Sequence, residues 1–183
     1  MFLDDMNGFK ELNKEQVITA RRMEMDYFRK MGVYRKVRRE EAKAMGCKVI
    51  TTKWLDTNKG DEAAPNYRSR LVGREVKHDN RLDLFAATPP LETLKFITSL
   101  CAKGQKDGKK RRMAVIDIKR AYFYAPSKRP VFIEIPEEDK EEGDKDKVGR
   151  LELSLYGTRD AAQNWCQEYT TTLKKWGFEV GRS

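Results

Sequence analysis

Several features of common enzyme and scaffold classes are absent from or scarce in this sequence. It has one histidine, His78, and three cysteines, Cys47, Cys101 and Cys166. The cysteines are far apart, odd in number and match no zinc-binding spacing, so we expect reduced thiols rather than a disulfide framework or a zinc site. No serine or cysteine nucleophile lies at a suggestive spacing from His78, which we interpret as a surface residue.

The sequence also lacks a long hydrophobic run and a signal-peptide pattern. No apolar segment approaches the ~20 residues needed to cross a bilayer. Residues 1–10 are mixed polar and acidic, rather than charged and then apolar. We therefore expect an intracellular protein, cytoplasmic or nuclear, with no membrane partner.

Positive charge is what the sequence has in excess. Its 38 lysines and arginines outnumber its 29 acidic residues, which gives a net charge of +9. A basic balance of this kind indicates an anionic partner, and nucleic acid is the commonest. Many basic proteins never bind nucleic acid, so a solvated charged surface is the alternative.

Local patterns in the first half predict helices and strands in mixed order. Residues 1–12 are expected to be a loose N-terminal segment. Asn13 and Gln16 then predict the capped start of a helix that Gly32 ends. A strand is expected over 33–37. The apolar stripe of the helix is expected to be Ala20, Met23, Tyr27 and Met31.

A β-hairpin is predicted next, with strands over 47–56 and 67–76. Because side chains alternate along a strand, Arg68, Arg70 and Arg74 are expected on one face of its second strand. Tyr67, Ser69 and Leu71 are expected on the other face.

The second half of the chain predicts further mixed structure, and the fold class is α+β. No internal repeat and no glycine-rich phosphate-binding βαβ motif is present. The expected elements are a helix over 91–102, strands over 113–118, 131–135 and 151–155, a charged mobile loop over 137–147, a helix from about 158 to 176 and a strand beginning at 178–180.

Asp117 is the strongest candidate for a functional residue. It closes the apolar strand predicted over 113–118, and a carboxylate at a buried strand end is costly unless a partner compensates its charge. Mg²⁺ is one such partner, because it prefers carboxylates and phosphate oxygens. An aspartate that caps the following turn is the alternative.

The block Ile-Asp-Ile-Lys-Arg-Ala-Tyr-Phe at 116–123 resembles the first polymerase motif of copia-type retrotransposon reverse transcriptases. In that family, an acid on a strand is followed five residues later by an aromatic residue. The resemblance implies that Asp117 binds both catalytic metal ions and that the backbone carbonyl of Ile118 helps to hold one of them. It also implies that Tyr122 lies under the sugar and excludes a 2′-hydroxyl.

The predicted hairpin resembles the fingers hairpin of the same family, with Lys-Trp at 53–54 and Tyr-Arg-Ser-Arg-Leu-Val at 67–72. That family uses basic residues here to hold the incoming triphosphate. The resemblance gives this role to Arg68 and Arg70, and it suits them because guanidinium groups bind phosphate oxygens bidentately. A solvated basic face is the alternative for both.

Two more blocks follow in the family's order. Phe-Ala-Ala-Thr-Pro at 85–89 resembles its Phe-Ala-Pro block, and Leu-Ser-Leu-Tyr-Gly at 153–157 resembles a glycine turn beside the nascent base pair. Gly157 is therefore expected next to substrate. At 158–160 the sequence departs from the usual Leu-Lys-Gln, and Asp160 brings a negative charge near the template path. Expected contacts to nucleic acid are Lys53, Arg74 and Arg159, with a plain surface lysine as the alternative for Lys53.

The resemblance implies part of a right-hand polymerase fold, an antiparallel sheet with packed helices, with fingers over about 33–90 and a partial palm over about 91–183. The implied activity is RNA-directed DNA polymerisation, with deoxynucleoside triphosphates, an RNA template, a DNA primer and two Mg²⁺ or Mn²⁺ ions. The family's Tyr-x-Asp-Asp hairpin, thumb and ribonuclease H portions do not occur in this sequence. We therefore expect the chain alone to be inactive. The alternative is a non-enzymatic basic nucleic-acid-binding or interaction module from a decayed element.

Overall fold

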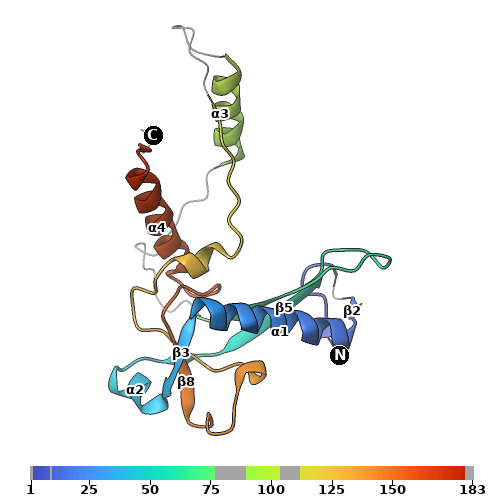
Figure 1. Cartoon of the computed structure of the whole chain (residues 1–183), viewed down its shortest axis with the longest axis vertical. Coiled ribbons are helices and arrows are strands. Elements are labelled where there is room, and N and C mark those ends of the chain that lie inside the picture. Colours follow the sequence, from blue (N-terminus) through green and yellow to red (C-terminus); the bar gives the residue numbers. More distant parts are fainter. Residues whose placement is uncertain (1, 9, 77–89, 104–111, 180–183) are drawn as a thin grey trace.

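The computed structural model describes residues 2–8, 10–76, 90–103 and 112–179 (Figure 1). The fold is α+β, as predicted. Its α-helices are α1 (Lys14–Met31), α2 (Arg39–Ala44), α3 (Leu91–Lys103) and α4 (Ala161–Lys175). Two short 3-10 helices are η2 (Ala121–Tyr124) and η3 (Glu137–Asp139).

The strands of the described residues form three small sheets. The predicted hairpin is confirmed, because β5 (Thr52–Asn58) pairs antiparallel with β6 (Tyr67–Gly73). A second pair joins β1 (Phe2–Leu3) to β2 (Glu11–Leu12). The third sheet has the order β3-β8-β7-β4, and its β4–β7 pair is parallel, so the expected antiparallel pairing holds only for the other pairs. Its strands are β3 (Tyr34–Arg38), β4 (Val49–Ile50), β7 (Phe132–Ile133) and β8 (Lys147–Leu151).

Helix α1 begins and ends where the sequence predicts. The Asn13 side chain accepts a hydrogen bond from the Gln16 backbone N–H at 3.1 Å, and Gly32 ends the helix with a φ of 65°. The predicted apolar stripe is only partly correct, because the Met23 side chain is 66% exposed. Met25 and Phe28 are buried instead. The apolar face of α1 therefore includes Met25 and Phe28 in place of Met23.

The main hydrophobic core lies where α1, the hairpin and η2 meet. Phe28 of α1 and Phe123 of η2 are both buried, and their ring centroids are 4.8 Å apart in an edge-to-face arrangement. Leu71 of β6 and Leu155, which precedes α4, belong to the same cluster. Figure 1 shows α1 running across the β5–β6 hairpin, which explains why these distant segments share one core.

The N-terminal segment is held in place, contrary to the expected loose start over 1–12. The Asp4 carboxylate is buried and accepts hydrogen bonds from the backbone N–H groups of Met6, Asn7 and Asn58. Burial by itself raises the pKa of Asp4, but these N–H groups outweigh it and hold that pKa well below its ordinary value. The segment was mispredicted because its partner, Asn58, lies far away in the sequence.

The strands predicted over 113–118 and 151–155 are also wrong. Residues 112–118 have no regular structure and are exposed, and Val115 and Ile116 are 81% and 68% exposed. A strand needs a partner for its backbone groups, and none of the described strands pairs with this segment. Strand β8 lies earlier than predicted, and β7 occupies only part of 131–135.

Helix α3 confirms the helix predicted over 91–102, but it has no buried residue. Figure 1 shows it standing apart from α1 and from the sheets. The block over 85–89 and His78 lie outside the described residues, as does the end of the strand predicted over 178–180. Among the described helices, none combines the length and the apolar character that crossing a membrane requires.

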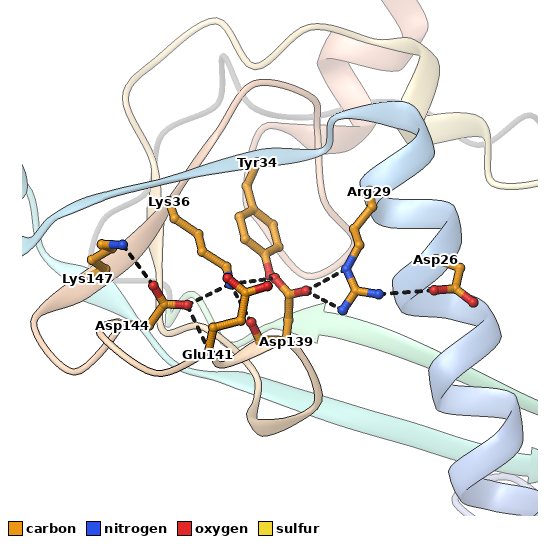
Figure 2. A network of polar contacts seen from close by, with 8 residues as sticks. All are labelled: Asp26, Arg29, Tyr34, Lys36, Asp139, Glu141, Asp144 and Lys147. Atoms are coloured by element: carbon orange, nitrogen blue, oxygen red, sulfur yellow. Dashed lines mark hydrogen bonds and ion pairs between the residues drawn. The ribbon is translucent and has the colours of Figure 1, made fainter.

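The acidic loop before β8 is anchored by ion pairs, although a mobile loop was expected (Figure 2). Asp139 is buried, accepts a 2.5 Å hydrogen bond from the Tyr34 hydroxyl and forms a 2.6 Å ion pair with Arg29 of α1. Asp144 is also buried and pairs with Lys36 of β3 at 2.6 Å. The loop thus ties α1 to the edge of the four-stranded sheet.

Asp144 should make folding depend on pH in the acid range. Hydrogen bonds from Lys36 and Lys147 lower the pKa of Asp144 from the ordinary 3.8 to about 2. Because the folded-state pKa is depressed, this stabilisation is complete above about pH 4 and is lost as the pH falls through about 2. Asp144→Asn should flatten the dependence of the unfolding free energy on pH between these values, as measured by urea unfolding. Asp146→Asn is the matched control, and equal slopes in both variants would contradict the prediction.

Candidate active site

The hairpin and the turn before α4 meet through two glycines. The Gly73 N–H at the end of β6 donates a 2.7 Å hydrogen bond to the Tyr156 carbonyl. Gly157 has a φ of +81°, and a Cβ built on it would lie 2.0 Å from the Gly73 carbonyl oxygen. Only glycine allows this conformation and this backbone approach. The close approach that the sequence predicted at Gly157 therefore has the Gly73 backbone as its partner in this structure.

Two tyrosine rings lie against each other beside this junction. Tyr122 in η2 is half-buried, and its ring centroid is 4.5 Å from that of Tyr156. Phe123 packs edge-to-face on Tyr156 at 5.9 Å and is itself fully buried. Burial raises the pKa of Tyr156, so its hydroxyl stays neutral at physiological pH. Through these ring contacts, the block at 116–123 touches the glycine turn at 153–157.

Arg70 brings the hairpin to the same place. Its guanidinium carbon lies 5.7 Å from the centroid of the Tyr156 ring, within the range of a cation–π contact. The predicted alternation along β6 is confirmed, because Arg68 and Arg70 are exposed while Ser69 and Leu71 are buried. The Arg68 side chain makes no hydrogen bond or ion pair with the residues that the structure describes, which leaves its charge available to a ligand.

Arg120 fixes the backbone between Asp117 and Tyr122. It has a φ of 53°, in the left-handed region that costs about 1–3 kcal/mol for a residue other than glycine. Its guanidinium forms a 2.7 Å ion pair with the buried Glu24 of α1 and lies 4.2 Å from the Tyr27 ring centroid. The resemblance of this helix to the segment before the family's fingers includes Glu24 but gives it no role, because its partner is 96 residues away.

Asp117 lies in the extended segment before η2 and is exposed, not buried at a strand end. It lines a largely apolar cavity of about 730 Å³ together with Ile118 and the α4 side chains Trp165 and Tyr169. Within the described part of the chain, no hydrogen bond or ion pair holds its carboxylate. Neither a buried charge nor a turn cap therefore accounts for this residue.

The described residues do not by themselves fit a divalent metal ion. No group of three or more histidine, cysteine or acidic side chains comes together among them. Asp117 and the adjacent Ile118 carbonyl could supply oxygen atoms, which suit Mg²⁺, but a lone carboxylate makes an incomplete ligand set. Any ion bound here needs further protein ligands or substrate oxygens.

The three residues predicted to contact nucleic acid have different surroundings. The Lys53 ammonium pairs with Asp5 at 2.7 Å, so its charge is already compensated by the N-terminal segment. Arg74 and Arg159 line one cavity of about 400 Å³. Asp160 is buried and pairs with Arg129 at 2.9 Å, so its negative charge is offset within the protein.

The chain is similar to segments of retrotransposon polyproteins. Residues 33–182 match the family described as reverse transcriptase (RNA-dependent DNA polymerase). The chain is 25% identical over 166 residues to the Retrovirus-related Pol polyprotein from transposon TNT 1-94 of Nicotiana tabacum, an alignment that covers 88% of this chain and 12% of that protein. It is 26% identical over 171 residues to the Truncated transposon Ty1-A Gag-Pol polyprotein of Saccharomyces cerevisiae, with 92% and 14% covered. The corresponding values for the Transposon Ty1-DR5 Gag-Pol polyprotein of the same yeast are 27% over 172 residues, with 92% and 9% covered. The chain thus spans less than a sixth of each relative, and no solved structure matches it.

Proposed function

Because this chain belongs to the reverse transcriptase (RNA-dependent DNA polymerase) family, we propose that it supplies the fingers and the first part of the palm of an RNA-directed DNA polymerase from a copia-type retrotransposon. The fingers comprise about residues 33–90 and the partial palm about residues 91–183 of a right-hand fold. Its substrates are deoxynucleoside triphosphates, and its partners are an RNA template and a DNA primer.

One observation carries this proposal. Three blocks that are distant in the sequence meet at one point, where Arg70 of the hairpin lies over Tyr156 and the Tyr122 ring packs at a tilt of 37° against the same ring. The contact between Gly73 and Gly157 holds the hairpin and the turn together at this point. A cation beside exposed aromatic rings suits nucleotide recognition, because cations bind phosphate and bases stack on aromatic side chains.

The proposal gives four of the predicted residues a role at this point. Arg68 and Arg70 project from the exposed face of β6 and bind the oxygen atoms of the triphosphate. The Tyr122 ring packs against Tyr156, which holds it in place. It thus forms a fixed wall that sterically excludes a sugar 2′-hydroxyl. Gly157 brings the turn before α4 close to this wall, beside which we expect the base pair being formed to lie.

Asp117 and the Ile118 carbonyl are the proposed metal ligands of this segment. Two ions, Mg²⁺ or Mn²⁺, need more carboxylates than one, and the described residues bring no acidic cluster together. We therefore propose that residues 1–183 bind nucleic acid but do not polymerise DNA by themselves. The remaining ligands would come from other parts of a longer polyprotein, such as those that the relatives represent.

Replacing Tyr122 with alanine tests the proposal through nucleotide choice. In the protein made from the complete natural transcript, primer extension on poly(rA)–oligo(dT) should proceed with Mg²⁺ and dTTP. Tyr122→Ala should reduce the preference for dTTP over UTP by at least roughly tenfold, because the steric wall is removed. A ratio of two substrates on one enzyme is insensitive to a general loss of stability.

Tyr124→Ala is the matched control, because Tyr124 lies in the same short helix and its side chain is 49% exposed. Its dTTP preference should stay within about twofold of the native value. An unchanged preference in Tyr122→Ala would refute the assigned gate. Binding of primer–template without any extension would refute the enzyme and leave the non-enzymatic binding module.

A further inference from the structure

We infer that the cavity formed by the residue before β4, the end of β6 and the start of α4 binds a phosphate group of a nucleic-acid backbone. Four basic side chains line this cavity of about 400 Å³: Lys48, Arg74, Arg129 and Arg159. They come from four separate segments, so it is the fold that brings them together. They do not form a continuous basic run in the sequence. Lys48 and Arg129 were not expected to bind a ligand on sequence grounds.

Among the described residues that line the cavity, basic side chains outnumber acidic ones. Glu75 is the one carboxylate of this described lining, and it accepts hydrogen bonds from the Arg129 guanidinium at 2.6 Å and from the Arg159 backbone N–H at 2.9 Å. The side chains of Lys48 and Arg74 form no ion pair with any residue that the structure describes. Both are exposed, so their charges face solvent rather than a protein carboxylate.

The Arg129 guanidinium has one N–H group without an acceptor. Its terminal nitrogen Nη2 pairs with Glu75 and with Asp160, and these two carboxylates fix the guanidinium at the cavity wall. Its Nε is the buried side-chain nitrogen, among the described residues, that has no hydrogen-bond partner. An unsatisfied buried N–H is rare in folded proteins and calls for an explanation. Because Nε is shielded from solvent in this structure, a phosphate oxygen in the cavity becomes its acceptor only when the Arg129 guanidinium shifts.

The position of the cavity favours a nucleic-acid strand as the source of the phosphate. Arg74 directly follows Gly73, and Arg159 lies two residues after Gly157, so both extend from the glycine junction of the proposed active site. A strand that enters the site therefore passes close to these cations. The identity of the ligand rests on the proposed function, whereas the cavity itself does not.

The test measures how tightly residues 1–183 bind a fluorescein-labelled DNA primer annealed to an RNA template. Fluorescence anisotropy gives the affinity at each of a range of salt concentrations. The double variant Lys48→Ala/Arg74→Ala should weaken binding about tenfold and lower the slope of log affinity against log salt by about two, because two phosphate contacts are lost. The control is Lys14→Ala/Arg22→Ala, which removes the same charge from exposed positions of α1. Its affinity should stay within about twofold of the native value, with an unchanged slope.

Equal losses in the two double variants would overturn the cavity as a site and indicate nonspecific attraction. Inorganic phosphate, compared with chloride at matched ionic strength, should compete for the cavity and therefore weaken strand binding by the native protein more than by Lys48→Ala/Arg74→Ala. If this difference appears although both proteins bind the strand equally well in chloride, the cavity takes the free ion and not the strand. Neither result bears on the nucleotide preference set by Tyr122, so a failure here is distinct from a failure of the polymerase proposal.

Discussion

Asp117→Asn should lower the rate of primer extension on the order of a thousandfold in the protein made from the complete natural transcript. Asparagine keeps the size of the side chain but removes the charge that a metal ion requires, and metal-ion stabilisation of the transition state is worth several kcal/mol. A thousandfold loss corresponds to about 4 kcal/mol. The measurement is single-turnover extension of a DNA primer on an RNA template at saturating Mg²⁺.

The structure allows this effect to be separated from a folding defect. Asp117 is exposed and has no hydrogen bond or ion pair within the described part of the chain, so the substitution should change the unfolding free energy by no more than about 0.5 kcal/mol. Asp146→Asn, which alters an exposed acid in the loop before β8, should leave extension unchanged. Extension by Asp117→Asn within tenfold of the native rate would remove this residue from the active site.

Gly157→Ala should destabilise the chain by about 3–5 kcal/mol. The added Cβ would lie 2.0 Å from the Gly73 carbonyl oxygen, and the φ of +81° is itself unfavourable for alanine. Backbone, not a flexible side chain, would have to move. Urea unfolding of residues 1–183 measures the loss.

Gly46→Ala provides a matched comparison for this substitution. Gly46 also has a positive φ, of +64°, but a Cβ built on it meets nothing within 4 Å. It should therefore cost only about 1 kcal/mol, the conformational part of the penalty. Equal costs at the two positions would show that the Gly73 contact is not tight in solution.

Elements defined by nearby residues were predicted well. The cap at Asn13, the end at Gly32 and the hairpin with its alternating Arg68 and Arg70 all follow from signals within a few residues of each other. The segment over 113–118 has a strong strand pattern, yet it has no strand partner among the described residues. Composition indicates what a strand prefers, whereas pairing decides whether it forms.

The same distinction between local and long-range signals applies to the candidate site. The resemblance predicts Asp117, Tyr122 and Gly157 as site residues, because each belongs to a short block whose order in the chain is characteristic. The roles of Glu24 and Arg129 were not predicted, since each residue acts through partners that only the fold brings near. The acidic loop was mispredicted for the same reason, because a high density of charge gives no indication of which charges will be paired.

The junction between Gly73 and Gly157 also has a mechanical consequence. Backbone hydrogen bonds run from Gly73 to the Tyr156 carbonyl at 2.7 Å and from Glu75 to the Gly157 carbonyl at 3.4 Å. Two parallel links of this kind resist a hinge, so the base of the hairpin moves together with the turn that leads into α4. Arg70, whose guanidinium lies over Tyr156, and the wall formed by Tyr122 and Tyr156 should therefore keep their relative positions when a ligand binds.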